Sequence, residues 1–342
     1  MESLIELQKK LCPELIQTMQ DRYMILRSID LFQPIGRRAL ADQTNSTERA
    51  IRSEVRFLQD QGLIHVSPKG MRPTKEGHLV LEQLAPFMGE LTRLNVLEER
   101  LQDILQLEEC IIVPGNSDQE NWVKQYMGQA CVSFLKNHLD NVKTIGVTGG
   151  ATMAAVADMM TPLDNGEQMM FVPARGGLGE HVENQANSIA AQMAKKANGA
   201  YRLLYVPDPL SETTYQSMMK EPGIQEVMQL IKQADMIIHG IGDALTMARR
   251  RKESEDVIES LKIMQAASEA FGYYFDDSGQ IVHKVRTAGI QLEDLQSIDS
   301  VIAVAGGSSK ARAIHSYFKT NRTKVLITDE AAAQHILRDH SL

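Results

Sequence analysis

Residues able to hold an anion recur in this chain where strands are predicted to end. Thr144–Val147 is a short β-branched run, and an Ala- and Met-rich helix begins at about Met153. The turn between them contains Gly149, Gly150 and Thr152. Such a turn directs backbone N–H groups and the positive end of a helix dipole at a ligand, and its glycines allow close approach. A single turn of this kind could equally be an ordinary strand-to-helix connection.

A second predicted strand, Val301–Ala305, is followed by the same kind of turn. That turn carries Gly307, Ser308, Ser309 and Lys310. Two hydroxyls and a lysine, placed where a helix is about to start, are groups that bind a phosphate. The repetition makes an anion site a better interpretation than a simple connection.

Two more predicted strands end in the same way. Met169–Val172 leads to Arg175 and Gly177, and Met236–His239 is followed by two glycines. The carboxyl ends of parallel strands lie along one edge of a sheet, so all four turns would meet there. The sequence therefore predicts a phosphate-bearing ligand at that edge. It has no Gly-x-x-x-x-Gly-Lys motif, and no Gly-x-Gly-x-x-Gly follows a strand, so neither standard nucleotide site is expected.

Alternating strands and helices from about residue 108 to the C-terminus must position these turns. Cys110–Val113 and Tyr201–Val206 are predicted as further strands, and Val325–Thr328 as the last one. A hairpin is expected over residues 273–285, with its turn at Asp-Ser-Gly. This alternation is typical of an α/β domain with a parallel sheet. We assign residues 108–342 to it.

The N-terminal part predicts a different kind of fold. Residues 2–20 and 21–32 read as two amphipathic helices. A short helix over 37–43 and a helix over 47–61 follow, then two strands joined by Ser-Pro-Lys-Gly. This order predicts a winged helix-turn-helix over residues 1–77. Residues 78–107 would be a helical linker, either a dimerising seam or a packed connection.

Basic and hydroxyl side chains mark one surface of the predicted winged helix-turn-helix. Arg49, Arg52 and Arg56 share a face of the helix over 47–61, because they are three and four residues apart. In this motif the second helix enters the major groove, and flanking cations contact phosphates. The predicted DNA-binding residues are Arg37, Arg38, Ser46, Thr47, Arg49, Arg52, Arg56 and Lys69. An isolated Arg stripe would more simply be a solvated helix face.

Composition agrees with two parts of different character. The 342 residues carry a net charge of −8, yet residues 1–75 have twelve Lys and Arg against nine Asp and Glu. A mildly basic segment therefore precedes an acidic body, as expected of a DNA-binding part joined to a ligand-binding part. No apolar run approaches the ~20 residues that span a bilayer. The three cysteines and scattered histidines have no metal spacing, so we expect a cytoplasmic protein without a metal.

Several stretches also carry a family resemblance that covers essentially the full length. These are Gly149–Gly150, Val172–Gly179, Tyr201–Pro207, Glu269–Phe275 and Ala305–Lys310. The chain resembles the sugar-responsive SorC/DeoR-type bacterial transcription regulators. The resemblance implies an effector domain with the α/β fold of sugar-phosphate isomerases and deaminases behind a DNA-binding head. It also implies a repressor of a glycolytic operon whose inducer is fructose-1,6-bisphosphate.

The resemblance further assigns roles to individual residues. It implies that one phosphate is held by Thr152, Arg175, Ser308, Ser309 and Lys310. Arg250 would reach the other phosphate and Glu269 would bind sugar hydroxyls. From the residues alone, Arg250 belongs to a solvated charge run and Glu269 is a surface residue. The family has a threonine where this chain has Ala151, so we expect weaker effector binding without its loss.

Three alternatives stay open at this point. The effector could be a monophosphate sugar or a sugar alcohol phosphate, which would not need the second cation, Arg250. The body could instead be a sugar-phosphate isomerase or deaminase, with His239 and Asp243 as the acid–base pair. A histidine within an apolar strand is more often a core residue, and an enzyme has no use for a DNA-binding head. We therefore expect a regulator that acts as a homo-oligomer on double-stranded operator DNA.

Overall fold

The computed structural model of the chain describes residues 11–339 except 45, 93, 164–167, 178–180 and 208–210. The chain divides into two compact units, one that ends at Asn95 and one that begins at Val96. They are called here the N-terminal unit and the C-terminal unit. Residues 2–10 of the helix expected over 2–20, and Leu178 and Gly179 of the Val172–Gly179 motif, lie outside the described residues.

The N-terminal unit has the winged helix-turn-helix order that the sequence predicts. Its elements are α2 (Pro13–Phe32), α3 (Arg37–Gln43), α4 (Glu48–Asp60), β1 (Ile64–Ser67), β2 (Gly70–Pro73) and α5 (Lys75–Thr92). One prediction was wrong: α2 is a single helix through residues 20 and 21, because no glycine or proline interrupts the chain there.

The α4 helix is built as its sequence indicates. The Thr47 hydroxyl caps it by accepting the Ala50 N–H at 3.2 Å, and Ile51, Val55 and Leu58 are buried. They share the core of the unit with residues of α2, α3 and the wing. The wing is the antiparallel β1–β2 hairpin, whose Met71 also pairs with Ile35. The core therefore fixes α4 and the hairpin relative to one another.

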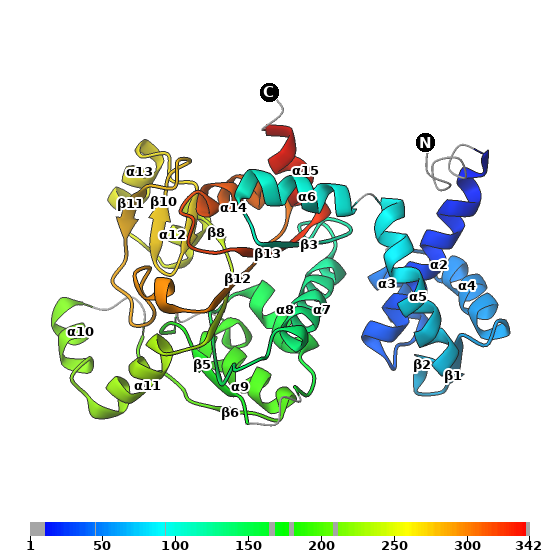
Figure 1. Cartoon of the computed structure of the whole chain (residues 1–342), viewed down its shortest axis with the longest axis horizontal. Coiled ribbons are helices and arrows are strands. Elements are labelled where there is room, and N and C mark those ends of the chain that lie inside the picture. The colour runs from blue at the N-terminus through cyan, green and yellow to red at the C-terminus, as the bar shows by residue number, and fades with distance from the viewer. Residues whose placement is uncertain are drawn as a thin grey trace. The chain divides into compact units, whose positions relative to one another are not determined.

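A seven-stranded parallel sheet forms the centre of the C-terminal unit, in the order β3-β13-β12-β7-β4-β5-β6 (Figure 1). Its strands are β3 (Glu109–Val113), β4 (Thr144–Val147), β5 (Met170–Pro173), β6 (Ala200–Tyr201), β7 (Met236–His239), β12 (Ser300–Val304) and β13 (Val325–Asp329). The helices are α6 (Leu94–Leu105), α7 (Asn121–Asn137), α8 (Ala151–Met159), α9 (Ala186–Ala197), α10 (Glu212–Met218), α11 (Pro222–Lys232), α12 (Ala244–Arg250), α13 (Glu255–Ile263), α14 (Ala311–Phe318) and α15 (Glu330–Asp339).

Side chains of neighbouring helices bond to the backbone at both edges of this sheet. The strand expected over Tyr201–Val206 shortens to β6, because the Asn187 side chain bonds both the N–H and the carbonyl of Leu204 at 3.0 Å. Those backbone groups no longer need a strand partner. At the opposite edge, Glu98 of α6 accepts the N–H of Ile112 in β3 at 2.8 Å.

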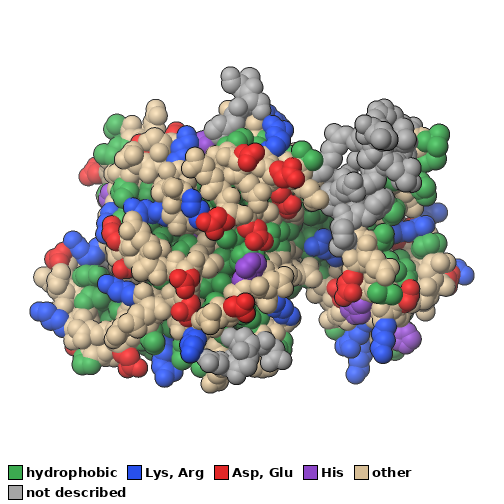
Figure 2. All heavy atoms as spheres, in the orientation of Figure 1, with side chains coloured by type: hydrophobic (Ala, Val, Ile, Leu, Met, Phe, Trp, Pro, Cys, Tyr) green, Lys and Arg blue, Asp and Glu red, His purple; other side chains and the backbone are tan. Residues whose placement is uncertain are grey.

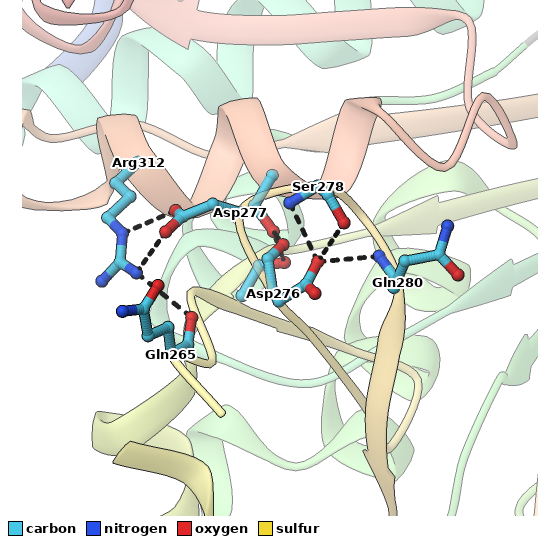
Figure 3. A network of polar contacts seen from close by, with 8 residues as sticks. Gln265, Asp276, Asp277, Ser278, Gln280 and Arg312 are labelled. Carbon is cyan, nitrogen blue, oxygen red and sulfur yellow. Dashed lines mark hydrogen bonds and ion pairs between the residues drawn. The ribbon is translucent and has the colours of Figure 1, made fainter. Parts of the chain in front are cut away.

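A small antiparallel sheet, β11-β10-β9-β8, accompanies the large one. It contains β8 (Gly242–Asp243), β9 (Ser268–Ala270), β10 (Tyr273–Phe275) and β11 (Ile281–Lys284), which confirms the expected hairpin. In the hairpin turn Asp276 accepts N–H groups of Ser278 and Gln280, and Asp277 pairs with Arg312 of α14 (Figure 3). The turn thereby ties the small sheet to the helix that follows Lys310.

The boundaries 1–77, 78–107 and 108–342 and the dimerising role of the linker stay predictions. Within the C-terminal unit, Leu101 of α6 is fully buried by its own chain. No helix among the described residues combines the length and hydrophobicity that a bilayer crossing requires.

Candidate functional site

The four glycine-ended strands are neighbours in the sheet, in the order β12-β7-β4-β5. Their parallel alignment brings the four turns to one edge, as predicted. A cavity of about 390 Å³ opens there, and we call it the strand-end cavity. Its volume lies within the range of ligand pockets, which is roughly 300–1,000 Å³.

Most of the predicted effector-binding residues line this cavity. They are Gly149, Gly150, Thr152, Arg175, Arg250, Glu269, Ser309 and Lys310. Gly307 and Ser308 adjoin the lining through Ser309. Gly177 is not among the lining residues: its N–H donates to the Val206 carbonyl at 3.0 Å, so it joins the chain after β5 to the chain after β6.

Two glycines give the turns after β4 and β12 the same backbone conformation. Gly150 has φ of 115° and Gly307 has φ of 101°, a region that other residues rarely adopt. The Gly307 N–H donates to the fully buried carboxylate of Asp329 at 2.7 Å. That carboxylate also accepts the Ser117 N–H at 2.8 Å, so Asp329 joins the turn after β12 to the chain after β3.

A buried charge cluster forms the wall of the cavity beside β9. Glu269 is 3% exposed, which corrects its interpretation as a surface residue. Its Oε1 lies 2.5 Å from Nη2 of Arg251 and 3.7 Å from Nη1 of Arg175, and it accepts the Gly272 N–H at 2.8 Å. Two arginines therefore pair with one buried carboxylate in this wall.

Two further cations come from α12 and from the turn before α14. Arg250 is exposed, as the charge run suggested, yet it lines the cavity. Lys310 is half-buried, and burial together with the nearby charge of Lys124 lowers the pKa of its ammonium. An anion in the cavity would raise that pKa again, because it stabilises the charged form.

His239 belongs to the core of the sheet, as its apolar neighbours indicated. It is fully buried, with Nδ1 3.0 Å from the Gly240 carbonyl oxygen and Nε2 3.3 Å from the Thr323 hydroxyl. Burial lowers the pKa of the imidazole to about 4. It is therefore a neutral structural residue at physiological pH.

This burial predicts a loss of stability in acid. Because the folded-state pKa of His239 is about 4, below the ordinary 6.5, its stabilising effect is complete above pH 6.5 and is lost as the pH falls toward 4. Between pH 7 and pH 4.5 the loss should be about 2–3 kcal/mol. Urea unfolding of wild type and His239→Gln at both pH values measures it. The exposed His65→Gln is the control, and an equal pH dependence in all three proteins would contradict the assignment.

The N-terminal unit presents the predicted DNA-binding residues to solvent. Arg37, Arg38, Ser46, Thr47, Arg49, Arg52, Arg56 and Lys69 are all exposed. Figure 2 shows Lys and Arg side chains protruding at the hairpin end of this unit. The Arg face of α4 lies opposite its buried stripe and is available to a polyanion.

Family models account for both units. The model of the CggR N-terminal DNA-binding domain matches residues 18–88, and that of a sugar-binding domain matches residues 90–338. The chain belongs to the SorC/DeoR family of sugar-binding transcriptional regulators. This family consists of regulators and not of enzymes, so the isomerase or deaminase alternative is set aside.

Individual members of the SorC/DeoR family are similar over long stretches. The central glycolytic genes regulators of Priestia megaterium and Bacillus subtilis are 53% and 49% identical to this chain; the alignments cover 99% of this chain and 99% and 100% of theirs. A crystal structure of a chain from Enterococcus faecalis, assigned to the SorC family, has 48% identity and a TM-score of 0.67. It covers 70% of this chain and 99% of its own length.

The structure of this SorC/DeoR-family chain also adds cavity residues that the sequence did not suggest. Asp118 and Lys124, from the turn after β3 and the start of α7, both line the cavity. The sequence signal that could have indicated them is the Pro114–Gly115 pair, because it marks the end of a fifth strand, β3, in the same sheet. Arg251 lies behind the wall and gave no sign apart from its place in the charge run.

Proposed function

We propose that this chain is a transcriptional repressor of a glycolytic operon whose inducer is fructose-1,6-bisphosphate. The observation that carries the proposal is the gathering of Arg175, Arg250 and Lys310 around one cavity of sugar-phosphate size. A ligand with a single phosphate would not need so many cations. The full-length similarity to central glycolytic genes regulators supports the same target.

In this proposal the two ends of the ligand meet different elements. One phosphate lies at the turns after β4, β5 and β12, held by Thr152, Arg175, Ser308, Ser309 and Lys310. Arg250 of α12 meets the other phosphate, and the fixed carboxylate of Glu269 accepts sugar hydroxyls. Ala151 offers no hydroxyl at the start of α8, so the affinity should be lower than with threonine by a factor of about 2–10.

The regulatory step is a shift between populations of a cytoplasmic homo-oligomer. Two N-terminal units of a symmetric assembly meet two operator half-sites, with α4 in the major groove. Effector binding favours an arrangement in which the two heads no longer match the half-sites. By linkage, operator DNA must weaken effector binding by the same factor by which the effector weakens DNA binding.

The DNA-binding face has a direct test in Arg52→Ala. We expect operator affinity to fall about 5- to 150-fold, because one contact to a base or a phosphate is lost. Effector affinity should not change, since Arg52 lies in the other unit. The matched control is Arg100→Ala, which removes an exposed arginine from α6. Fluorescence anisotropy at one fixed salt concentration measures both, and unchanged binding by Arg52→Ala would place the DNA face elsewhere.

The function itself is tested by titrating the repressor–operator complex with sugar phosphates. We expect fructose-1,6-bisphosphate to weaken operator binding and fructose-6-phosphate to have much less effect. Equal effects of both would favour a monophosphate or a sugar alcohol phosphate as the natural effector. Intact operator binding with no response to either ligand would reject the proposed inducer and leave the DNA-binding function in place.

A further inference from the structure

The anion-binding turn after β12 already holds an anion that belongs to the protein. Oδ2 of Asp118 accepts the Ser309 N–H at 2.8 Å and the Ser308 hydroxyl at 3.2 Å. Oδ1 accepts the Ser309 hydroxyl at 3.0 Å. These are the same donors that would hold a phosphate, so the carboxylate and a phosphate compete for one set of hydrogen bonds.

Hydrogen bonds within the loop that carries Asp118 hold its carboxylate at this turn. The Asp118 N–H donates to Oδ1 of Asn116 at 3.0 Å, and Nδ2 of Asn116 donates to the Ser308 hydroxyl at 3.2 Å. The N–H of Ser117 is fixed on Asp329. The fit against the turn is close, because a Cβ on Gly307 would lie 2.4 Å from the Asp118 carboxylate.

The carboxylate is charged in this position. Burial opposes ionisation, but hydrogen bonds from Ser309 and Ser308 and the charge of Lys310 together lower the pKa of Asp118. Other charged groups that line the same cavity are Lys124, Arg175, Asp243, Arg250 and Glu269. Asp118 therefore places a negative charge at the donors of the turn after β12, in a cavity that other carboxylates and cations also line.

We propose that Asp118 is an internal competitor for the phosphate subsite and determines which ligands the strand-end cavity accepts. This inference rests on the proposed function of the cavity as a sugar-phosphate site. A neutral sugar, or a ligand with one weak charge, cannot replace a carboxylate that accepts three hydrogen bonds. A phosphate dianion can, because it brings more charge and three acceptor oxygens to the same donors.

The opposite role for Asp118 makes the opposite prediction. If the carboxylate only orders the turn for the ligand, its removal should weaken anion binding. If it competes, removal should strengthen binding, because the ligand no longer has to displace it. The direction of the change in affinity therefore distinguishes the two roles.

Calorimetric titration of the full-length chain tests the inference with two ligands, inorganic phosphate and fructose-1,6-bisphosphate. The proteins are wild type, Asp118→Ala, Asp118→Asn and the control Asp140→Ala. Asp118 precedes α7, and the control removes an exposed carboxylate that follows the same helix. We expect both Asp118 variants to bind each anion about tenfold more tightly than wild type, and the control to match wild type. Asp118→Asn keeps the size of the side chain, so it still reports if the alanine variant folds poorly.

The outcomes separate this inference from the proposed effector. Tighter binding of inorganic phosphate by the Asp118 variants supports the competitor even if no protein binds the bisphosphate, a result that would reject only the effector. Weaker or unchanged anion binding in both variants overturns the inference, whatever the effector is. Failure of all four proteins to bind inorganic phosphate and the bisphosphate overturns it as well.

Discussion

Replacing Arg251 by methionine is expected to lower the free energy of unfolding of the C-terminal unit by about 3–5 kcal/mol. The Arg251 side chain is fully buried and its guanidinium is the nearer of two partners of Glu269, at 2.5 Å against 3.7 Å for Arg175. Methionine has a similar length and no charge. Among the described residues, the variant therefore leaves the buried carboxylate with the more distant Arg175 and the Gly272 N–H.

Urea unfolding of wild type, Arg251→Met and Arg249→Met measures this effect. Arg249 is exposed in the last turn of α12, two residues before Arg251, so its variant controls for the loss of a positive charge from this part of the chain. Adding Glu269→Gln to Arg251→Met should restore much of the stability, because the unpaired charge is then gone. A loss below about 1 kcal/mol for Arg251→Met would show that the cluster does not depend on this pair.

Replacing Lys310 by methionine is expected to weaken binding of fructose-1,6-bisphosphate about 10- to 150-fold. The estimate corresponds to the 1.5–3 kcal/mol that a hydrogen bond to a charged group contributes. Operator binding without effector should not change. The control is Lys319→Met, which removes an exposed lysine that follows α14. Calorimetry measures binding of the bisphosphate, and fluorescence anisotropy measures binding of operator DNA.

The pH dependence gives this variant a second readout. Lys310 binds an anion only in its charged form, and burial and Lys124 lower its pKa. Above about pH 7 the phosphates are dianions, so wild-type affinity should be complete there and fall as the pH rises through a range below the ordinary lysine value of about 10.5. Lys310→Met should lack that decline, and a wild-type affinity that stays constant through this range would argue against Lys310 as a ligand.

Local patterns were enough to predict the turns of the cavity and the exposed Arg face of α4. Each of these patterns, a glycine after a β-branched run or a capped helix with an Arg stripe, is contained in a stretch of about ten residues. Glu269 could not be read in this way, because β9 is three residues long and its burial depends on Arg251 and Arg175.

The sequence also could not show that neighbouring arginines of one charge run lie in different environments. Arg250 is exposed at the cavity while Arg251 is buried behind it, since successive helix residues point about 100° apart. The contact between Asp118 and Ser309 joins residues 191 positions apart in the sequence. Pairings at such separations are set by the topology of the sheet, which no local pattern contains.

The bond between Glu98 and the N–H of Ile112 gives the C-terminal unit a simple mechanical property. Strand β3 lies at the edge of the sheet, pairs only with β13 among the described strands, and leads into the loop of Asp118. An edge strand can shift with fewer broken contacts than a central one. Through Glu98, α6 is bonded to this edge strand and so to the loop of Asp118 that follows it, and a shift of β3 would strain that bond directly.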